Sequence, residues 1–411
     1  MRAYLDHAAT TPMRPEALAA MLPYLTEHFG NPSSRSTPGR RALLALDEAR
    51  EQVAGDLGCE PGEVVFCSGG TEAANMAVSG AITATSAVTS AGVSVGPSGS
   101  ARRSSDLGDR YPVAVCSAVE HHSVLRSVLG SGGTTLGVGP DGLVDFDALE
   151  VTLRGLSDRV AIVAVMLANN EVGTVQPVSR VSELVRAHCP HAVFFVDAVH
   201  AVPWLDVAQL CSCADMLAVS AHKFGGPKGV GALVVRDRTR WRPVSRGGEQ
   251  ERGRRPGTEN VAGIVAMAAA LRVTVEHRAG ETLRVGLLRD RLADSICGST
   301  AGIAETGVTI GADGRPDRSN KVAGGCHLSV EGVERDELMF LLDAEGVHAS
   351  SGSACASGAS EASHVLQAMG IDVDPNGPAA LRLSLGHSTS EAEIDHAIAI
   401  VPKVVEHLRA G

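Results

Sequence analysis

The sequence predicts an α/β protein with two lobes: a large lobe built on a mainly parallel sheet flanked by helices, and a smaller α+β lobe. The chain has 411 residues, which is too long for one compact core. Short β-branched apolar runs alternate with amphipathic segments through the middle of the chain, as expected for strands buried on both faces. From about residue 259 the pattern changes to a long alanine-rich segment, two further strands and a final amphipathic helix.

The predicted large lobe covers residues 12–258, and its strands are the short apolar runs. The first run is followed by a helix predicted over residues 71–81. Because helical segments separate near-continuous apolar strands, the sheet is expected to be parallel or mixed and covered on both faces. The strands are predicted at residues 63–67, 111–116, 160–167, 193–196, 216–219 and 231–235.

The predicted small lobe combines residues 1–11 with residues 259–411. Residues 84–110 consist mostly of Ser, Gly, Ala, Thr and Val and are predicted to be a surface insertion without chemistry, since such a composition buries little. The elements predicted for the small lobe are a helix over residues 261–279, strands at residues 327–330 and 381–385, and a closing helix over residues 391–408.

Composition and charge argue against several classes of function. The formal net charge of −11 disfavours a nucleic-acid surface, because phosphate binding requires a basic face. Nine scattered cysteines without a C-x-x-C pattern predict neither a disulfide framework nor a zinc site. We therefore expect no metal and a reducing, cytoplasmic compartment. The N-terminus lacks the apolar stretch of a signal peptide, and the longest apolar run, at residues 160–168, is far shorter than the ~20 residues of a membrane span.

The strongest local signal for chemistry is Lys223, in the segment S-A-H-K-F-G-G-P-K-G of residues 220–229. A lysine that follows a strand and precedes glycines can be held partly desolvated, which lowers the pKa of its amine and frees it to form a Schiff base. Ser220 and His222 flank the lysine, and both can donate hydrogen bonds to a phosphate. Taken alone, the segment fits a surface lysine before a glycine-rich turn equally well.

A second signal is S-G-G-T-E-A-A-N, residues 68–75, at a predicted strand-to-helix junction. Two glycines let the backbone approach an anion, and the helix N-terminus offers free N–H groups. The hydroxyl of Thr71 adds a further donor. These features are compatible with a phosphate site, but an ordinary capped helix start is the simpler interpretation of this segment by itself.

Two further polar residues follow predicted strands. Asp197 ends an apolar strand, where a carboxylate needs a partner. In an enzyme that uses pyridoxal phosphate (PLP), this partner is the pyridinium nitrogen, which the carboxylate keeps protonated so that the ring can accept electrons. A helix N-cap is the alternative for Asp197. His121 can stack on a cofactor ring, although a lone histidine is more often structural.

Several motifs occur in a characteristic order and together resemble one family. The segments are Y-L-D-H-A-A-T-T-P (4–12), G-N-P-S-S (30–34), residues 68–75, E-H (120–121), N-N-E-V-G-T (169–174), residues 220–229, R-P-G-T-E-N (255–260) and S-S-G-S-A-C-A-S-G (350–358). This set resembles the NifS/IscS-type cysteine desulfurases, which belong to the class V aminotransferase group of fold-type I PLP enzymes. The resemblance covers nearly the whole chain apart from the 84–110 insertion, and it implies the PLP-transferase fold with the catalytic cysteine in the small domain.

The resemblance implies a role in cofactor binding for each matching residue. Lys223 is expected to hold PLP as a Schiff base, Asp197 to pair with its ring nitrogen, and His121 to stack on the ring and move protons. The other cofactor contacts are expected from Gly70, Thr71, Asn170, His200, Ser220 and His222.

Other matching residues are expected to contact the substrate or a second copy of the chain. Thr258 matches a phosphate ligand that the family lends across a dimer interface, which implies a homodimer. Arg382, in the segment L-R-L-S, matches the arginine that holds the substrate carboxylate with two parallel hydrogen bonds. Asn31 and Asn170 are also expected to contact the substrate.

Cys355 determines which PLP reaction is expected. Most cysteines are buried in the core. Because Ser, Gly and Ala surround Cys355, it is instead expected on an accessible loop. The family match implies that its thiolate takes sulfur from L-cysteine, leaving L-alanine and a persulfide. The persulfide would then pass to an acceptor protein of iron–sulfur cluster assembly or of tRNA or DNA thio-modification. No direct contact with nucleic acid or membrane is expected.

The chain departs from the family pattern at two positions. His200 stands where the family usually has a glutamine that donates to the cofactor phenolate. A neutral imidazole can also donate there, so the activity is expected to survive, while the pKa of the cofactor Schiff base, and with it the pH optimum, stays open. Glu249 stands where a third glycine is usual. The alternatives are a selenocysteine lyase or transaminase on the same scaffold, and a catalytically silent partner protein. A transaminase would have no use for Cys355, and a silent protein would have no need of Lys223.

Overall fold

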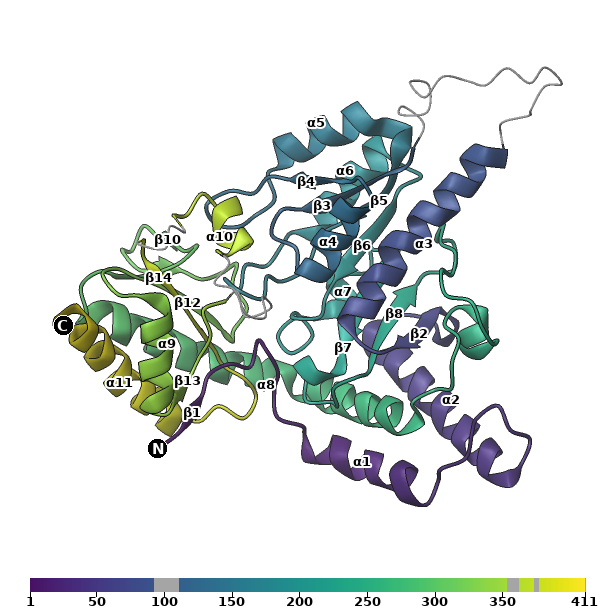
Figure 1. The fold of residues 1–411 in the computed structure, drawn as a ribbon, viewed down its shortest axis with the longest axis horizontal. Coiled ribbons are helices and arrows are strands. Elements are labelled where there is room, and N and C mark those ends of the chain that lie inside the picture. Colours follow the sequence, from purple (N-terminus) through teal and green to yellow (C-terminus); the bar gives the residue numbers. More distant parts are fainter. Residues whose placement is uncertain (92–110, 353–361, 373–376, 411) are drawn as a thin grey trace.

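The computed structural model describes residues 1–91, 111–352, 362–372 and 377–410 (Figure 1). Its central sheet has seven strands in the order β2-β8-β7-β6-β5-β3-β4. Neighbouring strands are parallel except at β8, which is antiparallel to both β2 and β7. This confirms the predicted α/β class with a mainly parallel sheet. The strands are β2 (Val64–Cys67), β3 (Val113–Ser117), β4 (Thr134–Leu136), β5 (Val160–Ala164), β6 (Val193–Asp197), β7 (Met216–Ser220) and β8 (Gly231–Val235).

Helices cover both faces of the sheet, which explains why its strands are apolar throughout. Successive residues of β6 alternate between the faces: Phe195 packs with α3 and α4, whereas Phe194 belongs to the cluster that includes α5 and α6. Both phenylalanines are fully buried. The helices of this part of the chain are α1 (Pro15–Thr26), α2 (Thr37–Leu57), α3 (Gly70–Ala91), α4 (His122–Gly130), α5 (Phe146–Leu156), α6 (Val178–His188) and the short α7 (Val207–Leu210).

A single long helix, α8 (Val261–Ser299), connects the two ends of the molecule (Figure 1). Its first half packs on α1 and α2, and its second half contacts elements of the small lobe. The predicted end of this helix at residue 279 was wrong. The buried face resumes at Val285, Leu288 and Leu292 after a polar stretch that interrupts the apolar pattern in the sequence.

The C-terminal elements form a smaller α+β layer. A three-stranded antiparallel sheet has the order β14-β12-β9, and β1 (Ala3–Tyr4) pairs in parallel with β13 (Val347–His348). This pairing supports placing the N-terminal residues with the small lobe; the division at residues 12–258 stays a prediction. The other elements are β9 (Ile303–Glu305), β10 (Thr309–Ile310), β11 (Pro316–Asp317), β12 (Gly325–Val330), α9 (Arg335–Ala344), α10 (His364–Ala368), β14 (Ala379–Ser384) and α11 (Glu391–Ala410).

The predicted insertion at residues 84–110 begins too early. Helix α3 continues through Ala91, and Ala84 is buried against the large lobe. The hydroxyls of Thr85 and Ser86 donate to backbone carbonyls four residues earlier, which lets such residues remain in a helix. Residues 92–110 lie outside the described residues.

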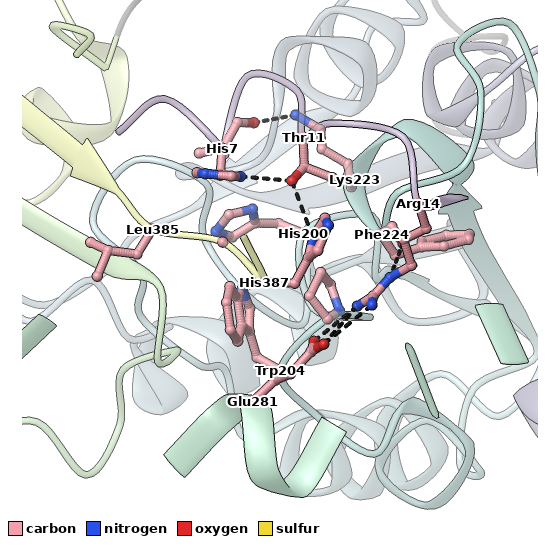
Figure 2. A pocket seen from close by; sticks show the side chains of 13 residues that line it. His7, Thr11, Arg14, His200, Trp204, Lys223, Phe224, Glu281, Leu385 and His387 are labelled. Atoms are coloured by element: carbon pink, nitrogen blue, oxygen red, sulfur yellow. Dashed lines mark hydrogen bonds and ion pairs between the residues drawn. The ribbon is translucent and has the colours of Figure 1, made fainter. Parts of the chain in front are cut away.

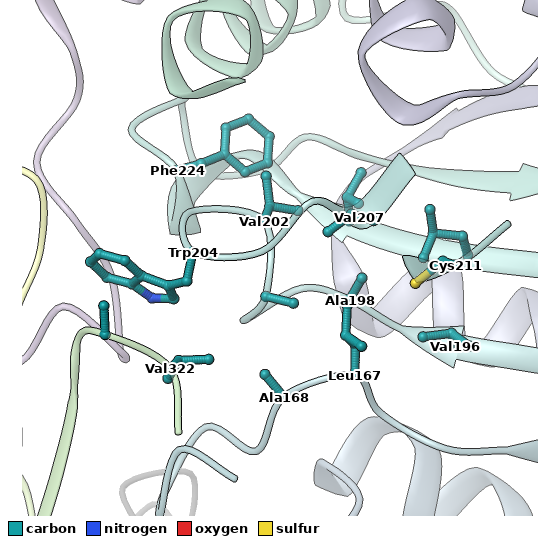
Figure 3. Packing of buried hydrophobic residues seen from close by; sticks show 14 of the residues in the cluster. Leu167, Ala168, Val196, Ala198, Val202, Trp204, Val207, Cys211, Phe224 and Val322 are labelled. Atoms are coloured by element: carbon teal, nitrogen blue, oxygen red, sulfur yellow. The ribbon is translucent and has the colours of Figure 1, made fainter. Parts of the chain in front are cut away.

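The main core extends from the sheet face covered by α5 and α6 into the small lobe, and Figure 3 shows part of it. Trp204 is only 7% exposed and packs there together with Val202 and Val322. Gly324 allows this approach, because a Cβ at that position would lie 2.4 Å from the indole ring. The predicted strand at residues 160–167 ends at Ala164, although the residues that follow stay buried as the chain enters the site.

Candidate functional site

A cavity of about 340 Å³ opens where the parallel strands of the sheet end. The carboxyl ends of β2, β3, β5, β6 and β7 all point to this edge, which is where open α/β sheets bind ligands. The volume is in the usual range for a small-molecule site. Ten of the predicted site residues line this cavity: Gly70, Thr71, His121, Asn170, Asp197, His200, Ser220, His222, Lys223 and Arg382.

Lys223 lies in the short 3₁₀ turn Ala221–Lys223 that follows β7. Its ammonium donates to the carbonyl oxygen of Ala8 (Figure 2). It also donates to the carbonyl oxygen of Ala9 at 3.0 Å. These two carbonyls hold the amine at the wall of the cavity. The amine is therefore placed to react with a bound carbonyl group.

One end of the cavity is built to receive an anion. The N-terminus of α3 begins directly after Gly69, whose φ of +145° favours glycine, and Ser220 and His222 approach from the end of β7. At Gly70 a Cβ would lie 2.8 Å from the side chain of Val199, so only glycine fits there without displacement. The first N–H groups of a helix have no partner within the helix and attract anions.

A buried carboxylate stands at another wall of the cavity. Asp197, at the end of β6, is 5% exposed, and its Oδ1 accepts the N–H of Val199 at 2.9 Å. Burial raises the pKa of this carboxyl to about 6, while the Val199 N–H and the Lys223 ammonium act to lower it. A carboxyl this poorly solvated gains strongly from a cationic partner such as a protonated ring nitrogen.

Glu120 lies near Asp197 and was not assigned a function from the sequence. It is fully buried, and its Oε1 accepts the N–H of Met166 at 2.6 Å. Its Oε2 has no hydrogen-bond partner. Burial, assisted by the nearby Asp197, raises the pKa of Glu120 well above its usual range, while the N–H of Met166 acts to lower it.

The histidines of the cavity are neutral at physiological pH. Burial and the Lys223 ammonium lower the pKa of His121 to about 4, that of His222 to about 4 and that of His200 to about 3. His121 caps α4, and its Nδ1 accepts the N–H of Ser123 at 3.2 Å. Its proton is therefore on Nε2, and the neutral ring can stack on an aromatic cofactor.

Arg382 reaches the cavity from β14 of the small lobe. Its Nη2 donates to Asp6 Oδ1 at 2.8 Å, and its Nη1 donates to the carbonyl of Asn170 at 3.1 Å. Its Nε is buried without a partner. The side chain of Arg382 is only 4% exposed. A substrate carboxylate bound to its guanidinium would therefore be largely shielded from water.

Three predicted site residues are not brought to this cavity. Asn31 is exposed in the α1–α2 turn, where its side chain accepts the N–H of Ser33. Thr258 is exposed in the turn before α8, and it lines neither the main cavity nor the open mouth beside the N-terminus of α3. Cys355 lies outside the described residues.

Several residues of the cavity were not predicted as site residues. The carbonyls of Ala8 and Ala9 receive the lysine, and Met166, Val199 and Gly352 complete the walls. The segment Y-L-D-H-A-A-T-T-P was noted in the sequence without any role for its backbone. Backbone acceptors and apolar walls have no side-chain signature, so only the structure reveals them.

A second, smaller cavity of about 20 Å³ lies next to the first (Figure 2). Lys223 and His200 line both cavities. Its wall contains a chain of polar contacts from His7 Nδ1 to Thr11 Oγ1 at 2.6 Å and from Thr11 Oγ1 to His387 Nδ1 at 3.5 Å. The space is sufficient for about one water molecule.

Two other classes of site were sought in the part of the chain that the structure describes. There, no group of three or more His, Cys, Asp or Glu side chains is arranged to hold a metal ion. None of the described helices has both the length and the apolar character required to cross a bilayer.

Comparison with known proteins agrees with this fold. The sequence pattern of the class-V aminotransferase family matches residues 3–94 and 108–396 of this chain. The solved structure of a NifS-like protein superimposes with a TM-score of 0.83 and 28% identity, covering 99% of this chain and 100% of the other. DndA from Streptomyces lividans superimposes with a TM-score of 0.68 and 30% identity over 93% of this chain and 99% of its own. The chain therefore belongs to the class-V aminotransferase family, with the fold of the NifS-like proteins.

Relatives of almost the same length show which group within this family the chain is most similar to. An IscS-like cysteine desulfurase of Mycobacterium tuberculosis is 40% identical over 99% of this chain and 97% of its own length. A cysteine desulfurase of Cereibacter sphaeroides is also 40% identical, over 100% of this chain and 97% of its own. Within the family the chain thus groups with the cysteine desulfurases, as the resemblance of its motifs implied.

Proposed function

We propose that the protein is a PLP-dependent cysteine desulfurase, which converts L-cysteine to L-alanine and leaves the sulfur as a persulfide on Cys355. The observation that supports this most directly is the cavity that combines Lys223, Asp197 and His121 with an anion-binding helix start and with Arg382. The similarity to cysteine desulfurases along the whole chain supports the same reaction.

The residues present fit PLP by charge and shape. Lys223 would hold the cofactor covalently, Asp197 would face its ring nitrogen, and His121 would stack on its ring. When bound, PLP supplies an acceptor for the electron pair left when a bond to the substrate α-carbon is broken. The phosphate and the remaining ring substituents would be held by Gly70, Thr71, Asn170, His200, Ser220 and His222.

The chain's own residues would perform the remaining tasks. Arg382 would bind the carboxylate of cysteine, and the Nζ of Lys223 would take the proton from the α-carbon. The thiolate of Cys355 would then attack the substrate sulfur. A new S–S bond forms while the C–S bond breaks, and its electron pair stays on the β-carbon of the substrate. The β-carbon then takes up one proton, and the Nζ of Lys223 would return the proton to the α-carbon, which completes alanine.

We also propose that two copies of the chain form a homodimer. The helices α1 and α2 and the turn between them expose large apolar side chains, which in a monomer would face water. Thr258, exposed on the same chain, would complete the phosphate site of the second copy. The exposed apolar side chains are Leu18, Leu22, Leu25, Phe29, Leu43 and Leu44.

The persulfide of Cys355 would be delivered to a separate acceptor protein. We propose a cytoplasmic site of action, since the cysteines that the structure describes are all free thiols. Iron–sulfur cluster assembly and the thio-modification of tRNA or DNA are the pathways that use such persulfides.

The proposed reaction can be tested in a single turnover with purified, PLP-loaded protein. After addition of L-cysteine, one alanine should appear for each persulfide formed, and the persulfide should map to Cys355. A Cys355→Ser protein should bind cysteine, seen as a change in the cofactor absorption, but should release no alanine. Absence of alanine from the unmodified protein would overturn the proposal, and full activity of the Cys355→Ser protein would favour another PLP reaction.

A further inference from the structure

The small cavity next to the main one brings the amine of Lys223 together with polar side chains that the proposed reaction does not use (Figure 2). His7, Thr11 and His387 line this cavity. His7 and Thr11 belong to the segment between β1 and α1, whereas His387 lies between β14 and α11. Only the tertiary fold therefore brings these three side chains to the lysine.

Thr11 is the centre of a chain of polar contacts in the wall of the small cavity. Its Oγ1 lies 2.6 Å from His7 Nδ1 and 3.5 Å from His387 Nδ1. His7 and Thr11 are each only 6% exposed. The second nitrogen of His7, Nε2, lies 3.3 Å from Thr389 Oγ1, and a Cβ at Gly386 would overlap the His7 ring. Close packing and contacts at both nitrogens thus hold the ring in place.

Both histidine rings are neutral at physiological pH. Burial and the nearby His387 lower the pKa of His7 to about 4. Burial and the nearby Arg14 guanidinium lower the pKa of His387 to about 4. A neutral imidazole has one donor and one acceptor nitrogen, and a hydroxyl both donates and accepts. Thr11 can therefore accept from one ring and donate to the other, which is the arrangement that a proton relay requires.

The chain of contacts has one end at the cavity and the other near solvent. The cavity, of about 20 Å³, has room for one water molecule, and the Lys223 amine lies in its wall. At the other end, His387 is half-buried and precedes the exposed Ser388. Arg14 and Glu281 also line the cavity, but they form an ion pair with each other at 2.9 Å.

We propose that the small cavity holds a water molecule, and that Thr11 and its two histidines pass protons between this water and solvent. This inference rests on the proposed function, in which the Lys223 amine takes the proton from the α-carbon of cysteine. Cofactor and substrate would then fill the main cavity, whereas the small cavity gives the amine a second route. One proton enters the relay at one end while another leaves at the other end, so every group keeps its number of protons.

The isotope content of the product measures this exchange. PLP-loaded protein is equilibrated in D₂O, and ordinary L-cysteine is added for a single turnover. The alanine from the unmodified protein should carry almost only deuterium at its α-carbon. Thr11→Val removes the hydroxyl, and about a third of its alanine should retain the α-hydrogen of cysteine, because an ammonium that does not exchange returns one of its three hydrogens.

Two further variants show whether the Thr11 hydroxyl is responsible. Thr11→Ser keeps the hydroxyl and should restore the exchange with solvent. Thr300→Val is the matched control, because Thr300 is also buried, at 4% exposure, but lies after α8 and away from the cavity. Its alanine should carry as much deuterium as that of the unmodified protein.

A second measurement does not depend on the reaction. In the full chain, with or without PLP, nitrogen NMR should show His7 and His387 as opposite tautomers, one protonated on Nδ1 and the other on Nε2. Thr11→Val should change the tautomer of at least one ring, whereas Thr300→Val should change neither. Protonation of both rings on the same nitrogen in the unmodified protein would contradict a relay through Thr11.

The isotope experiment can also overturn the inference. It fails if alanine from Thr11→Val retains no more α-hydrogen than alanine from the unmodified protein, or if Thr300→Val shows the same retention as Thr11→Val. If Thr11→Val does not fold, His387→Leu, which removes the outer ring, decides the question on the same criteria. Failure of the proposed function shows differently: the unmodified protein would then release no alanine.

Discussion

At the scale of single residues, His200 is the cavity residue that stands where the family resemblance led us to expect a glutamine. It lies three residues after Asp197 and lines both the main cavity and the smaller one behind Lys223. Burial, the Lys223 ammonium and the Arg382 guanidinium lower the pKa of His200 to about 3. The imidazole is therefore neutral at any working pH and offers one N–H, as the amide of glutamine would.

Replacing His200 tests whether this neutral donor is all that the position requires. His200→Gln should keep the rate of alanine release within about threefold, whereas His200→Ala, which removes the donor, should lose about 10-fold. The pKa of His200 lies far below pH 6, so its imidazole does not titrate between pH 6 and 9. In that range the acid limb of the pH profile of alanine release should therefore be the same for His200→Gln and the unmodified protein. A shift of that limb would show instead that His200 titrates in the working enzyme.

At the scale of elements, the strand that leads into the anion-binding turn is held by an ion pair. Glu251 accepts from Arg50 at 2.7 and 2.9 Å and from the N–H of Phe66, in β2, at 3.0 Å. The two charged side chains are 9% and 2% exposed. Glu251 adopts a φ of +51°, which is unusual for a residue with a side chain and indicates that these contacts impose its conformation. By contrast Glu249, the unusual residue of this segment, is exposed.

Removing one partner of this buried pair should be strongly destabilising. Glu251→Ala leaves the buried Arg50 charge without a carboxylate partner, and the free energy of unfolding should fall by about 3 to 5 kcal/mol. PLP affinity should fall too, since β2 leads directly into residues 68–75. The matched control is Glu276→Ala, which breaks an exposed pair with Arg272 on α8 and should cost about 0.5 kcal/mol or less. Urea unfolding of both variants is the measurement, and equal effects would contradict the role given to Glu251.

At the scale of the whole molecule, the proposed homodimer explains why the main cavity lacks Thr258. The segment that ends at Thr258 is bound to its own chain through Arg255, which pairs with Glu72 at the start of α3 at 2.9 Å. The residue itself is exposed and points to no described cavity. A site assembled from two chains accounts for both facts.

Mixed dimers provide the test of this arrangement. Lys223→Ala should be inactive, and Thr258→Ala should bind PLP about 10-fold more weakly. In a dimer that contains one chain of each, one site combines Lys223 of one copy with Thr258 of the other and is intact. At limiting PLP such dimers, separated by two different tags, should recover about half of the unmodified activity. No recovery would mean that Thr258 acts within its own chain.

Much of the fold was predictable because local patterns in the sequence report burial. The strands β6, β7 and β8 lie within one residue of their predicted ends. The ends of helices were less predictable, as at α3 and α8, because an alanine- and serine-rich or a polar stretch can remain helical when it packs on a neighbour. No local signal in the sequence marks where such packing begins or ends.

The sequence by itself determined which chemical groups the cavity contains. Lys223, Asp197 and His121 follow apolar strands, and parallel strands bring their carboxyl ends to one edge of a sheet. Only the tertiary structure decided which groups contact one another: the amine of Lys223 with the carbonyl of Ala8, and Thr11 with His387. These pairs are far apart along the chain, so their contact depends on how the two lobes pack, which no local pattern encodes.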